Sequence, residues 1–420
     1  MSSHPTTTRP PASAEAEPRG GVQQAVGDYL AKVRSGDIGS PSSVLGVVAL
    51  VALFTVAKPG VFDTPLNFAN LLNQSAAVIF ISMGLVFVLL LGEIDLSAGF
   101  TAGTSAAVLG VLVTQLGAPW YVAIIACVLT GTLIGLVVGL LVALLGIPSF
   151  VVTLAAFLGL QGVMLVVIGS AGTIPVRDAT ILGVMNSNLP LWGGWVFWGL
   201  VVAGVVAVGL ANQARRRRAG LPTGNVILFW VGVVGLDLLL AAAVYVLNLQ
   251  RAVNVEITSL QGVPVVVPVA AVFLVGLTFV LDRTRFGRHV YAVGGNAEAA
   301  RRSGINVARV RIACFMICSS MAAVAGVLLA SRDNSISPTT GGAQTLLFAV
   351  GAAVIGGVSL FGGKGRVHNA ILGGLVIAVI ANGLPLITSR SGIQFVVTGL
   401  VLLLAASVDA ISRHKAVATR

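Results

Sequence analysis

Charged residues are scarce in this 420-residue chain: only 9% of its residues are Asp, Glu, Lys or Arg. A soluble domain has about 25% charged residues. Hydrophobic residues make up 56% of the sequence, and the mean hydropathy is +0.99. This composition excludes a soluble protein with a single core and predicts an all-α membrane protein with many spans.

Cysteine and histidine are also rare, with three and four copies. Cys127, Cys314 and Cys318 all lie in apolar segments without a nearby His or acid, so they are expected to pack as small side chains. No disulfide framework is implied. We therefore expect no metal site and no cofactor, and no nucleophile-base pattern indicates a catalytic site.

The net charge of +11 comes from basic residues in the polar intervals between apolar runs. No basic domain with interleaved aromatic residues exists, which argues against nucleic-acid binding. Membrane proteins retain Lys and Arg on the cytoplasmic side. Most of the basic residues fall on one side if both termini are cytoplasmic, and the exceptions are Lys58, Arg177, Arg251, Arg332 and Arg390. We predict this topology in the plasma membrane, with the run 215–218 as an anchor near lipid head groups.

Twelve apolar runs approach the roughly 20 residues that a bilayer span needs. They cover residues 42–58, 72–91, 96–115, 120–146, 149–170, 191–211, 225–249, 262–282, 311–331, 342–360, 368–386 and 391–410. Residues 1–41 and 411–420 are predicted cytoplasmic tails, the first with an amphipathic helix from Val22. Glycine-rich segments near 92–99 and 356–365 are interpreted as broken or re-entrant helices or turns, so we expect ten to twelve spans.

Residues 282–311 form the longest polar interval between two apolar runs, with seven arginines against two acids. This interval contains the signals of a short helix in order. Gly294 and Gly295 break the chain, Asn296 is the N-cap, Glu298 lies in the first turn, Arg301 and Arg302 lie in the last turn, and Gly304 stops the helix. A capped helix of about two turns is marginal alone. We therefore predict that it docks on a partner, although a basic loop that only fixes topology is the alternative.

Two strings in this loop resemble known permeases. Glu298-Ala299-Ala300, followed after three residues by Gly304, resembles the EAA-type loop of ABC-importer permeases, whose short helix fits a groove on the ATPase subunit. The longer strings 286–296 and 303–307 resemble the sugar permeases of ribose- and xylose-type importers. The additional span near 225–249 looks more like the xylose type. The resemblance implies that the ATPase-coupling residues are Gly294, Gly295, Asn296, Glu298, Ala299, Ala300, Arg301, Arg302 and Gly304.

This resemblance covers roughly residues 60–410 and implies an ABC-importer permease fold. It also implies ABC ATPase subunits as partners, an extracytoplasmic sugar-binding protein, and a second permease copy, most simply a homodimer. The chain has no phosphate loop of its own, because the residues around Gly363-Lys364-Gly365 lack the required spacing. ATP hydrolysis is therefore expected on a separate subunit.

Acidic residues occur at two places in apolar surroundings. Glu93 and Asp95 lie with Ser97 in a stretch that resembles a motif of the sugar permeases, and they either face a wet pathway or cap the next helix, with Asp95 or Ser97 as N-cap. Residues 356–363 repeat the glycine and leucine spacing of 92–99, as paired segments of an internal repeat do. Asp237 lies mid-span, where it is either a coupling group or an interhelical hydrogen-bonding residue.

Uncharged hydrogen-bonding side chains in or beside the spans suit a neutral sugar, whereas an anion would lack a basic partner in the span interiors. The predicted pathway residues are Asn73, Gln74, Glu93, Asp95, Ser97, Thr153, Gln161 and Asn382. The predicted function is the permease subunit of an ATP-dependent, binding-protein-dependent monosaccharide importer, with a pentose such as xylose as cargo. The alternatives are an amino-acid ABC permease and an ion-coupled transporter that uses Glu93, Asp95 and Asp237.

Overall fold

The structure, a computed structural model, describes residues 39–221, 226–252 and 259–418. The predicted amphipathic helix from Val22 lies outside these residues. The helices are α2 (Gly39–Ala57), α3 (Pro65–Leu90), α4 (Ala98–Gly110), α5 (Trp120–Ala143), α6 (Ser149–Ile168), α7 (Ala179–Asn186), α8 (Leu191–Arg218), α9 (Val226–Asn248), α10 (Val266–Arg283), α11 (Arg285–Gly295), α12 (Ala297–Arg302), α13 (Val307–Asp333), α14 (Gly342–Ile355), α15 (Val367–Ile387) and α16 (Ser391–Ala418). A π-helical turn, η1 (Val111–Gln115), continues α4, and a 3₁₀ turn, η2 (Gly169–Ala171), follows α6. Two short strands, β1 (Ile174–Pro175) and β2 (Ser335–Ile336), pair antiparallel.

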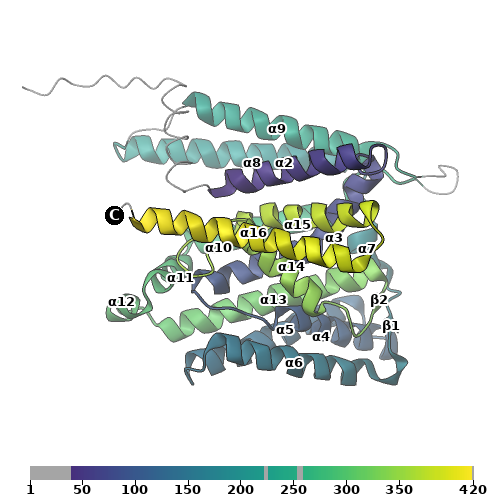
Figure 1. Cartoon of the computed structure of the whole chain (residues 1–420), viewed down its shortest axis with the longest axis horizontal. Helices are drawn as coiled ribbons and strands as arrows, with labels where there is room; N and C mark the ends of the chain where they lie inside the picture. The colour runs from purple at the N-terminus through teal and green to yellow at the C-terminus, as the bar shows by residue number, and fades with distance from the viewer. Residues whose placement is uncertain (1–38, 222–225, 253–258, 419–420) are drawn as a thin grey trace, which may run out of the picture.

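The helices run side by side along the long axis of the molecule (Figure 1). Among the described residues, nine are long and apolar enough to cross a membrane. Three shorter apolar helices, Ser43–Ala57, Gly342–Ile355 and Ser391–Val401, lie where three further spans were predicted. The prediction of an all-α polytopic membrane protein is confirmed.

Two of the predicted boundaries differ from the structure. The apolar run 342–360 is helical only to Ile355, and its remainder is part of the loop between α14 and α15, in which Gly357 has φ +99°. Helix α16 continues to Ala418, so the predicted C-terminal tail is largely helical. The connection from 171 to 190, for which the sequence left open a simple connector or an external lid or docking surface, contains β1 and α7.

Helices α3 and α13 form the centre of the bundle. Ser75 to Leu90 of α3 are all buried, and α13 is buried along most of its length against α3, α4 and α5. Three glycines one turn apart on α5 permit the closest of these approaches. A Cβ atom on Gly131 or Gly135 would lie 2.5 Å from a carbonyl oxygen of α13, and one on Gly139 would lie 2.8 Å from the Cα of Ile312. Small residues at such spacing let membrane helices pack with their backbones close together.

Helices α8 and α9 form a hairpin at the edge of the bundle, at the top of Figure 1. Only 6% of the α8 span window and 17% of the α9 window are buried, so both helices face outward over most of their surface. Asp237 lies in the middle of α9 and is half-buried, and the indole of Trp198 on α8 donates a hydrogen bond to its backbone oxygen. The additional span predicted near 225–249 is therefore present, but it is peripheral.

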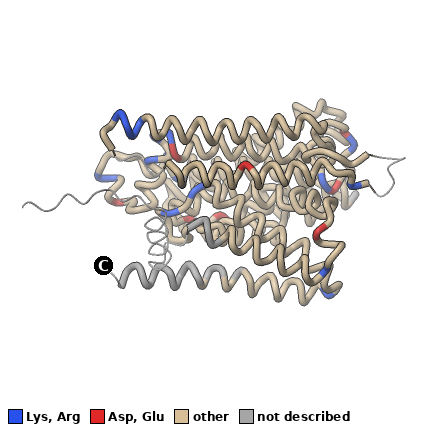
Figure 2. The backbone as a smooth tube through the Cα atoms, turned by 90° about the horizontal axis from the view of Figure 1, so that it is seen from above, with Lys and Arg blue, Asp and Glu red and all other residues tan. Residues whose placement is uncertain are grey.

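The two ends of the molecule differ. Helices α11 and α12 lie at one end together with the C-terminal end of α16, whereas α7 and the β1–β2 pair lie at the other (Figure 1). Helix α13 joins the two ends, because it begins directly after α12 and ends directly before β2. Lys and Arg are seen at both ends of the backbone, and the long middle section is almost free of them (Figure 2).

Candidate translocation pathway and coupling helix

A cavity of about 780 Å³ lies among α3, α14 and α15 near the β1–β2 end of the molecule. Its volume is in the range of pockets that hold small organic molecules, which is about 300–1,000 Å³. Apolar groups such as Val78, Phe100 and Phe348 form part of its wall. The uncharged polar side chains that line it are Gln74, Ser75, Gln161, Ser337, Thr339, Thr340, Gln344 and Thr345.

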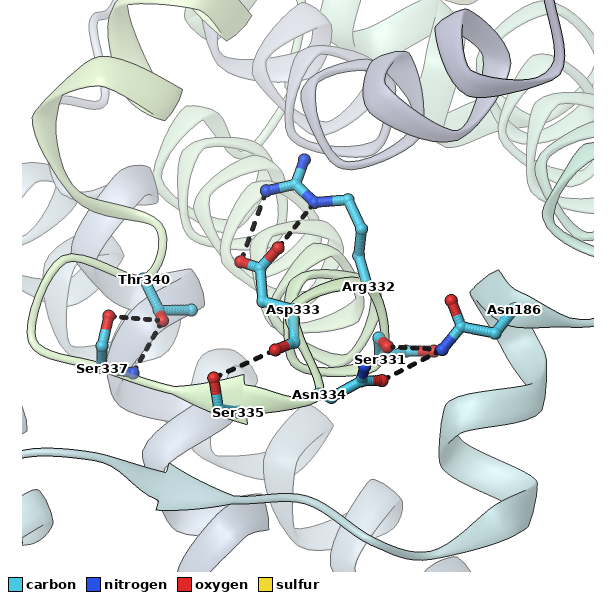
Figure 3. Close-up of polar contacts among 8 residues, drawn as sticks. All are labelled: Asn186, Ser331, Arg332, Asp333, Asn334, Ser335, Ser337 and Thr340. Atoms are coloured by element: carbon cyan, nitrogen blue, oxygen red, sulfur yellow. Dashed lines mark hydrogen bonds and ion pairs between the residues drawn. The ribbon is translucent and has the colours of Figure 1, made fainter. Parts of the chain in front are cut away.

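The turn that follows α13 contributes residues 337–341 to the cavity wall, and its polar contacts are drawn in Figure 3. Asn334 ends α13 in the left-handed conformation, with φ +53°. The amide of Asn186 on α7 donates to the Oδ1 of Asn334 and to the backbone oxygen of Ser331, each at 3.1 Å. Farther along, the hydroxyl of Thr340 accepts a hydrogen bond from the backbone N–H of Ser337 at 2.9 Å. The polar groups of this turn are thus fixed on both sides by the fold.

Two charged residues line the cavity, Arg332 and Asp333. They form an ion pair with each other, with Nε and Oδ1 2.8 Å apart, and both side chains are partly exposed (Figure 3). The lining residues therefore carry no net charge, and the cavity offers hydroxyl and amide groups that both donate and accept hydrogen bonds. An uncharged, polyhydroxylated molecule would match this lining.

The predicted pathway residues separate into two groups in the structure. Gln74 and Gln161 line the cavity, and Asn382 on α15 lies behind Gln74, to whose Oε1 it donates at 3.3 Å. Asn67 in turn donates to the Oδ1 of Asn382 at 2.9 Å. Asn73 is next to Gln74 in sequence, but it is not among the lining residues.

The second group lies away from the cavity: Glu93, Asp95 and Ser97 are in the loop between α3 and α4, and Thr153 is on α6. Asp95 is completely buried and accepts hydrogen bonds from the Ser97 hydroxyl at 2.6 Å and from its backbone N–H at 2.9 Å. The hydroxyl of Thr153 donates to the Ile94 oxygen at 3.2 Å. These residues hold the loop in place. Ser97 occupies the N-cap position of α4, one of the two residues predicted for it, although its side chain makes no capping bond.

The short helix predicted from the polar loop is present as α12. The Oδ1 of Asn296 accepts a hydrogen bond from the N–H of Ala299 at 2.9 Å, and Glu298 forms ion pairs with Arg301 and Arg302 at 2.9 and 3.1 Å. Gly304 ends the helix with φ +84°, and the N–H of Ile305 donates back to the oxygen of Ala300. These bonds form the C-terminal motif that satisfies the last carbonyls of a helix.

One face of α12 is free. Ala300 is buried toward α13, whereas Glu298, Ala299, Arg301 and Arg302 are exposed. The sequence predicted a helix break at Gly294 and Gly295, and this prediction is wrong. They are the last two residues of α11, and the break falls at Asn296, where the backbone is extended. The predicted short helix is therefore confirmed. Its docking on an ATPase subunit stays a prediction.

A family model described as "Branched-chain amino acid transport system / permease component" matches residues 67–406. The chain belongs to this permease family. Among curated proteins, it is 35% identical to the "Xylose transport system permease protein XylH" of Escherichia coli strain K12, over 89% of this chain and 92% of the relative. It is 29% identical to the "Ribose import permease protein RbsC" of the same strain, over 87% of this chain and 92% of the relative. No solved structure matches the chain.

Family membership makes the permease a multi-pass membrane component of a transport system. The matched region includes α12 as well as every wall of the cavity. Sequence reasoning missed Arg332, Asp333 and the Ser337–Thr340 turn, because it assigned this segment only to an external connection. The polar side chains of this short connection were the only sign of a cavity wall in the sequence. A short external loop without a functional role has equally polar residues, so this sign could not distinguish the two.

Proposed function

We propose that this permease is the membrane subunit of an ATP-dependent, binding-protein-dependent importer of a monosaccharide, with a pentose such as xylose as its cargo. The observation that carries the proposal is the cavity among α3, α14 and α15, which is lined by hydroxyl and amide groups and has no net charge. The names of the curated relatives, which are xylose and ribose permeases, support the same class of cargo.

The chemistry of the cavity distinguishes a sugar from an ion. A sugar hydroxyl both donates and accepts a hydrogen bond, as do the side chains of Gln74, Gln161 and Thr340 that would meet it. An anion would need an unpaired cation, and the guanidinium of Arg332 is already paired with Asp333. Transport also requires weak binding, so we place most of the selectivity on the binding protein that delivers the cargo.

An amino acid is the second candidate. The description of the family refers to branched-chain amino acids, and a zwitterion could exchange its own charges with the pair formed by Arg332 and Asp333. Such an exchange gains little, because a partly exposed ion pair is worth at most about 1 kcal/mol and the rest of the lining is uncharged. We therefore rank the sugar first and use leucine as the competing cargo in the test below.

We infer the partners from the family and from the difference between the two ends of the molecule. We place α12 in the cytoplasm, where its exposed residues Glu298, Ala299, Arg301 and Arg302 dock on an ABC ATPase subunit. The other predicted coupling residues, Gly294, Gly295, Asn296, Ala300 and Gly304, would hold this helix in place. The cavity then faces the opposite side, toward a sugar-binding protein. We place both termini in the cytoplasm because of the distribution of basic residues along the sequence. A second permease copy completes the membrane part. Lipids surround the outward faces of α8 and α9, with Arg215–Arg218 at the level of the cytoplasmic head groups.

The test is reconstitution of the permease with its ATPase and its binding protein in liposomes, followed by uptake of labelled xylose, ribose and leucine. We expect uptake of a pentose that requires ATP. Leucine uptake without sugar uptake would refute the sugar assignment, and xylose uptake driven by a proton gradient without ATP would refute the ABC mechanism. Empty liposomes and liposomes without the ATPase are the controls.

A further inference from the structure

The two glycine-rich loops of the sequence touch each other through their backbones. One is residues 91–97, after α3, and the other is residues 356–366, between α14 and α15. The N–H of Gly363 donates to the carbonyl oxygen of Leu90, the last residue of α3, at 2.9 Å. Gly362 has φ +84°, and a Cβ atom on it would lie 2.9 Å from the backbone nitrogen of Gly92. The loops are therefore packed without side chains between them.

The end of α11 packs on the same spot. A Cβ atom on Gly294 would overlap the carbonyl oxygen of Leu90 and would lie 3.0 Å from the nitrogen of Gly363. We call this contact of Leu90, Gly294 and Gly363 the Leu90 junction. One turn earlier on α11, the hydroxyl of Tyr291 donates to the oxygen of Gly365 at 2.8 Å. Burial, and secondarily the charge of Asp282, raises the pKa of Tyr291 to about 12, so this hydroxyl keeps its proton at physiological pH.

The junction ties together the helices that line the cavity. Helices α3, α14 and α15 all contribute to the cavity wall, and they approach the junction at their other ends, α3 through Leu90 and the other two through the 356–366 loop. On α3 the cavity wall ends at Val78, and the residues from Phe80 to Leu90 are almost completely inaccessible. A passage from the cavity to the α12 end therefore requires these helices to separate where the junction holds them.

Helix α11 is attached firmly enough to transmit such a separation. Only Asn296 separates α11 from α12, while Val290 and Val293 are buried in the main core and Phe286 stacks on Phe87 of α3 with a centroid separation of 6.5 Å. We propose that Gly294 is the positioning residue through which a displacement of α12 reaches the two glycine-rich loops and opens the α12 end of the pathway. This inference rests on the proposed function in assigning α12 to the ATPase and the cavity to the transport pathway.

A glycine is needed at 294 because the two backbones meet there. Gly294→Ala introduces a methyl group where Leu90 and Gly363 already lie, and this forces the loops apart without removing any polar group. Gly276→Ala is the matched control: it makes the same substitution on the adjacent helix α10, where a Cβ atom would meet nothing within 4 Å. Tyr291→Phe is a milder second variant, because it removes only the hydrogen bond to Gly365.

The separation of the loops can be measured without any cargo. Ser359 lies in the 356–366 loop and is 1% exposed. In a version with Cys127, Cys314 and Cys318 replaced by Ala, Ser359→Cys provides a single thiol, which is labelled by an impermeant maleimide in inside-out membrane vesicles. We expect slow labelling in this background and with Gly276→Ala, and labelling about tenfold faster with Gly294→Ala, a change that corresponds to the usual cost of overpacking.

Transport provides the second measurement. In liposomes with the ATPase and the binding protein, we expect Gly294→Ala to hydrolyse more ATP for each xylose molecule taken up than Gly276→Ala does. A defect that only destabilises the fold would lower the rate of ATP hydrolysis and the rate of xylose uptake together.

The outcomes separate this inference from the proposed function. Faster labelling with Gly294→Ala or Tyr291→Phe would support the role of the Leu90 junction. If the parent protein at the same time transports no xylose, the proposed cargo is refuted but the junction is not. If Gly294→Ala does not reach the membrane, the Tyr291→Phe variant tests the inference instead. We expect its labelling to be a few times faster than that of the control. Labelling that neither variant changes would overturn the inference, whatever the cargo is.

Discussion

The carboxylate of Glu93 lies 3.1 Å from the guanidinium of Arg311, and both side chains are largely buried. Glu93 belongs to the loop after α3, and Arg311 lies in the second turn of α13, which follows α12 directly. This ion pair therefore joins a glycine-rich loop to the helix that runs from α12 to the cavity wall. The Leu90 junction lies at the same end of α3, but it connects α3 to α11 and to the 356–366 loop through the backbone.

Removal of one member of this pair leaves the other charge partly buried. We expect Glu93→Gln to destabilise the permease by about 1–3 kcal/mol, between the values for exposed and for fully buried pairs, and to lower uptake. The single variants Glu93→Arg and Arg311→Glu should also be destabilised, and the double variant that carries both changes should recover part of the loss. A thermal unfolding assay in detergent measures the stability of the two single variants and of the double variant. Equal and additive losses would show that the two residues do not interact.

The N-cap of α12 gives a prediction with a close control. Asn296→Ala removes the side-chain bond to the N–H of Ala299 and should weaken the helix by about 1 kcal/mol. Asn296→Asp keeps an acceptor at the same place and adds a charge that the N-terminus of a helix favours. We expect the Ala variant to copurify with less ATPase and to transport more slowly at equal membrane abundance, and the Asp variant to match the parent. Equal copurification of the two variants would reduce α12 to a topology anchor.

Gln161 is the predicted pathway residue that is easiest to test in the cavity. Gln161→Leu keeps a similar size but removes both hydrogen-bonding groups, and uptake of a sugar should fall about fivefold, the effect of one hydrogen bond of about 1 kcal/mol. Gln115→Leu is the control, because Gln115 is exposed at the end of η1 and does not line the cavity. Uptake by the Gln161 variant at the rate of the control would exclude Gln161 from the pathway.

Asp237 tests the ion-coupled alternative. It lies on the peripheral helix α9 and does not line the cavity. Asp237→Asn has nearly the same shape and cannot release a proton, so we expect uptake to stay within about twofold of the parent, in line with substitutions away from a functional feature. A loss of transport with normal membrane abundance would reopen a coupling role for this carboxyl group.

The topology can be measured by labelling from one side. Ser303 is exposed next to α12, and Thr173 is exposed just before β1 at the other end. In the version without native cysteines, Ser303→Cys should react with an impermeant thiol reagent only in inside-out vesicles, and Thr173→Cys only in intact cells. The charge distribution predicts this result, and labelling of the Ser303 variant from outside would reverse the whole arrangement.

Local signals were sufficient for α12 but not for α11. The cap, the ion pairs and the glycine stop of α12 are all within nine residues, so the sequence predicts them directly. The α11 sequence contains three glycines and few strong helix formers. Apart from the local N-cap of Thr284, its helix depends on tertiary contacts, because Val290 and Val293 are buried in the main core. Such contacts override propensity and cannot be read from a single segment.

The pathway residues show the same limit at longer range. Polarity within apolar runs selected Gln74 and Gln161, which line the cavity, but it also selected Asp95 and Thr153, whose partners are within or beside the α3–α4 loop. A buried polar side chain looks the same in sequence whether its partner is a ligand or the backbone of a neighbouring helix. Only the packing of α3, α14 and α15 distinguishes the two cases.

The glycine seam between α5 and α13 restricts how this permease can change shape. Because backbone lies against backbone at three successive turns, a sliding or rolling motion of one helix over the other would produce an immediate steric clash. We therefore expect α5 and α13 to move as one rigid body in any transport cycle. Spin labels placed on their lipid-facing sides should keep one constant separation in the presence and absence of ATP, while separations from α13 to α14 change.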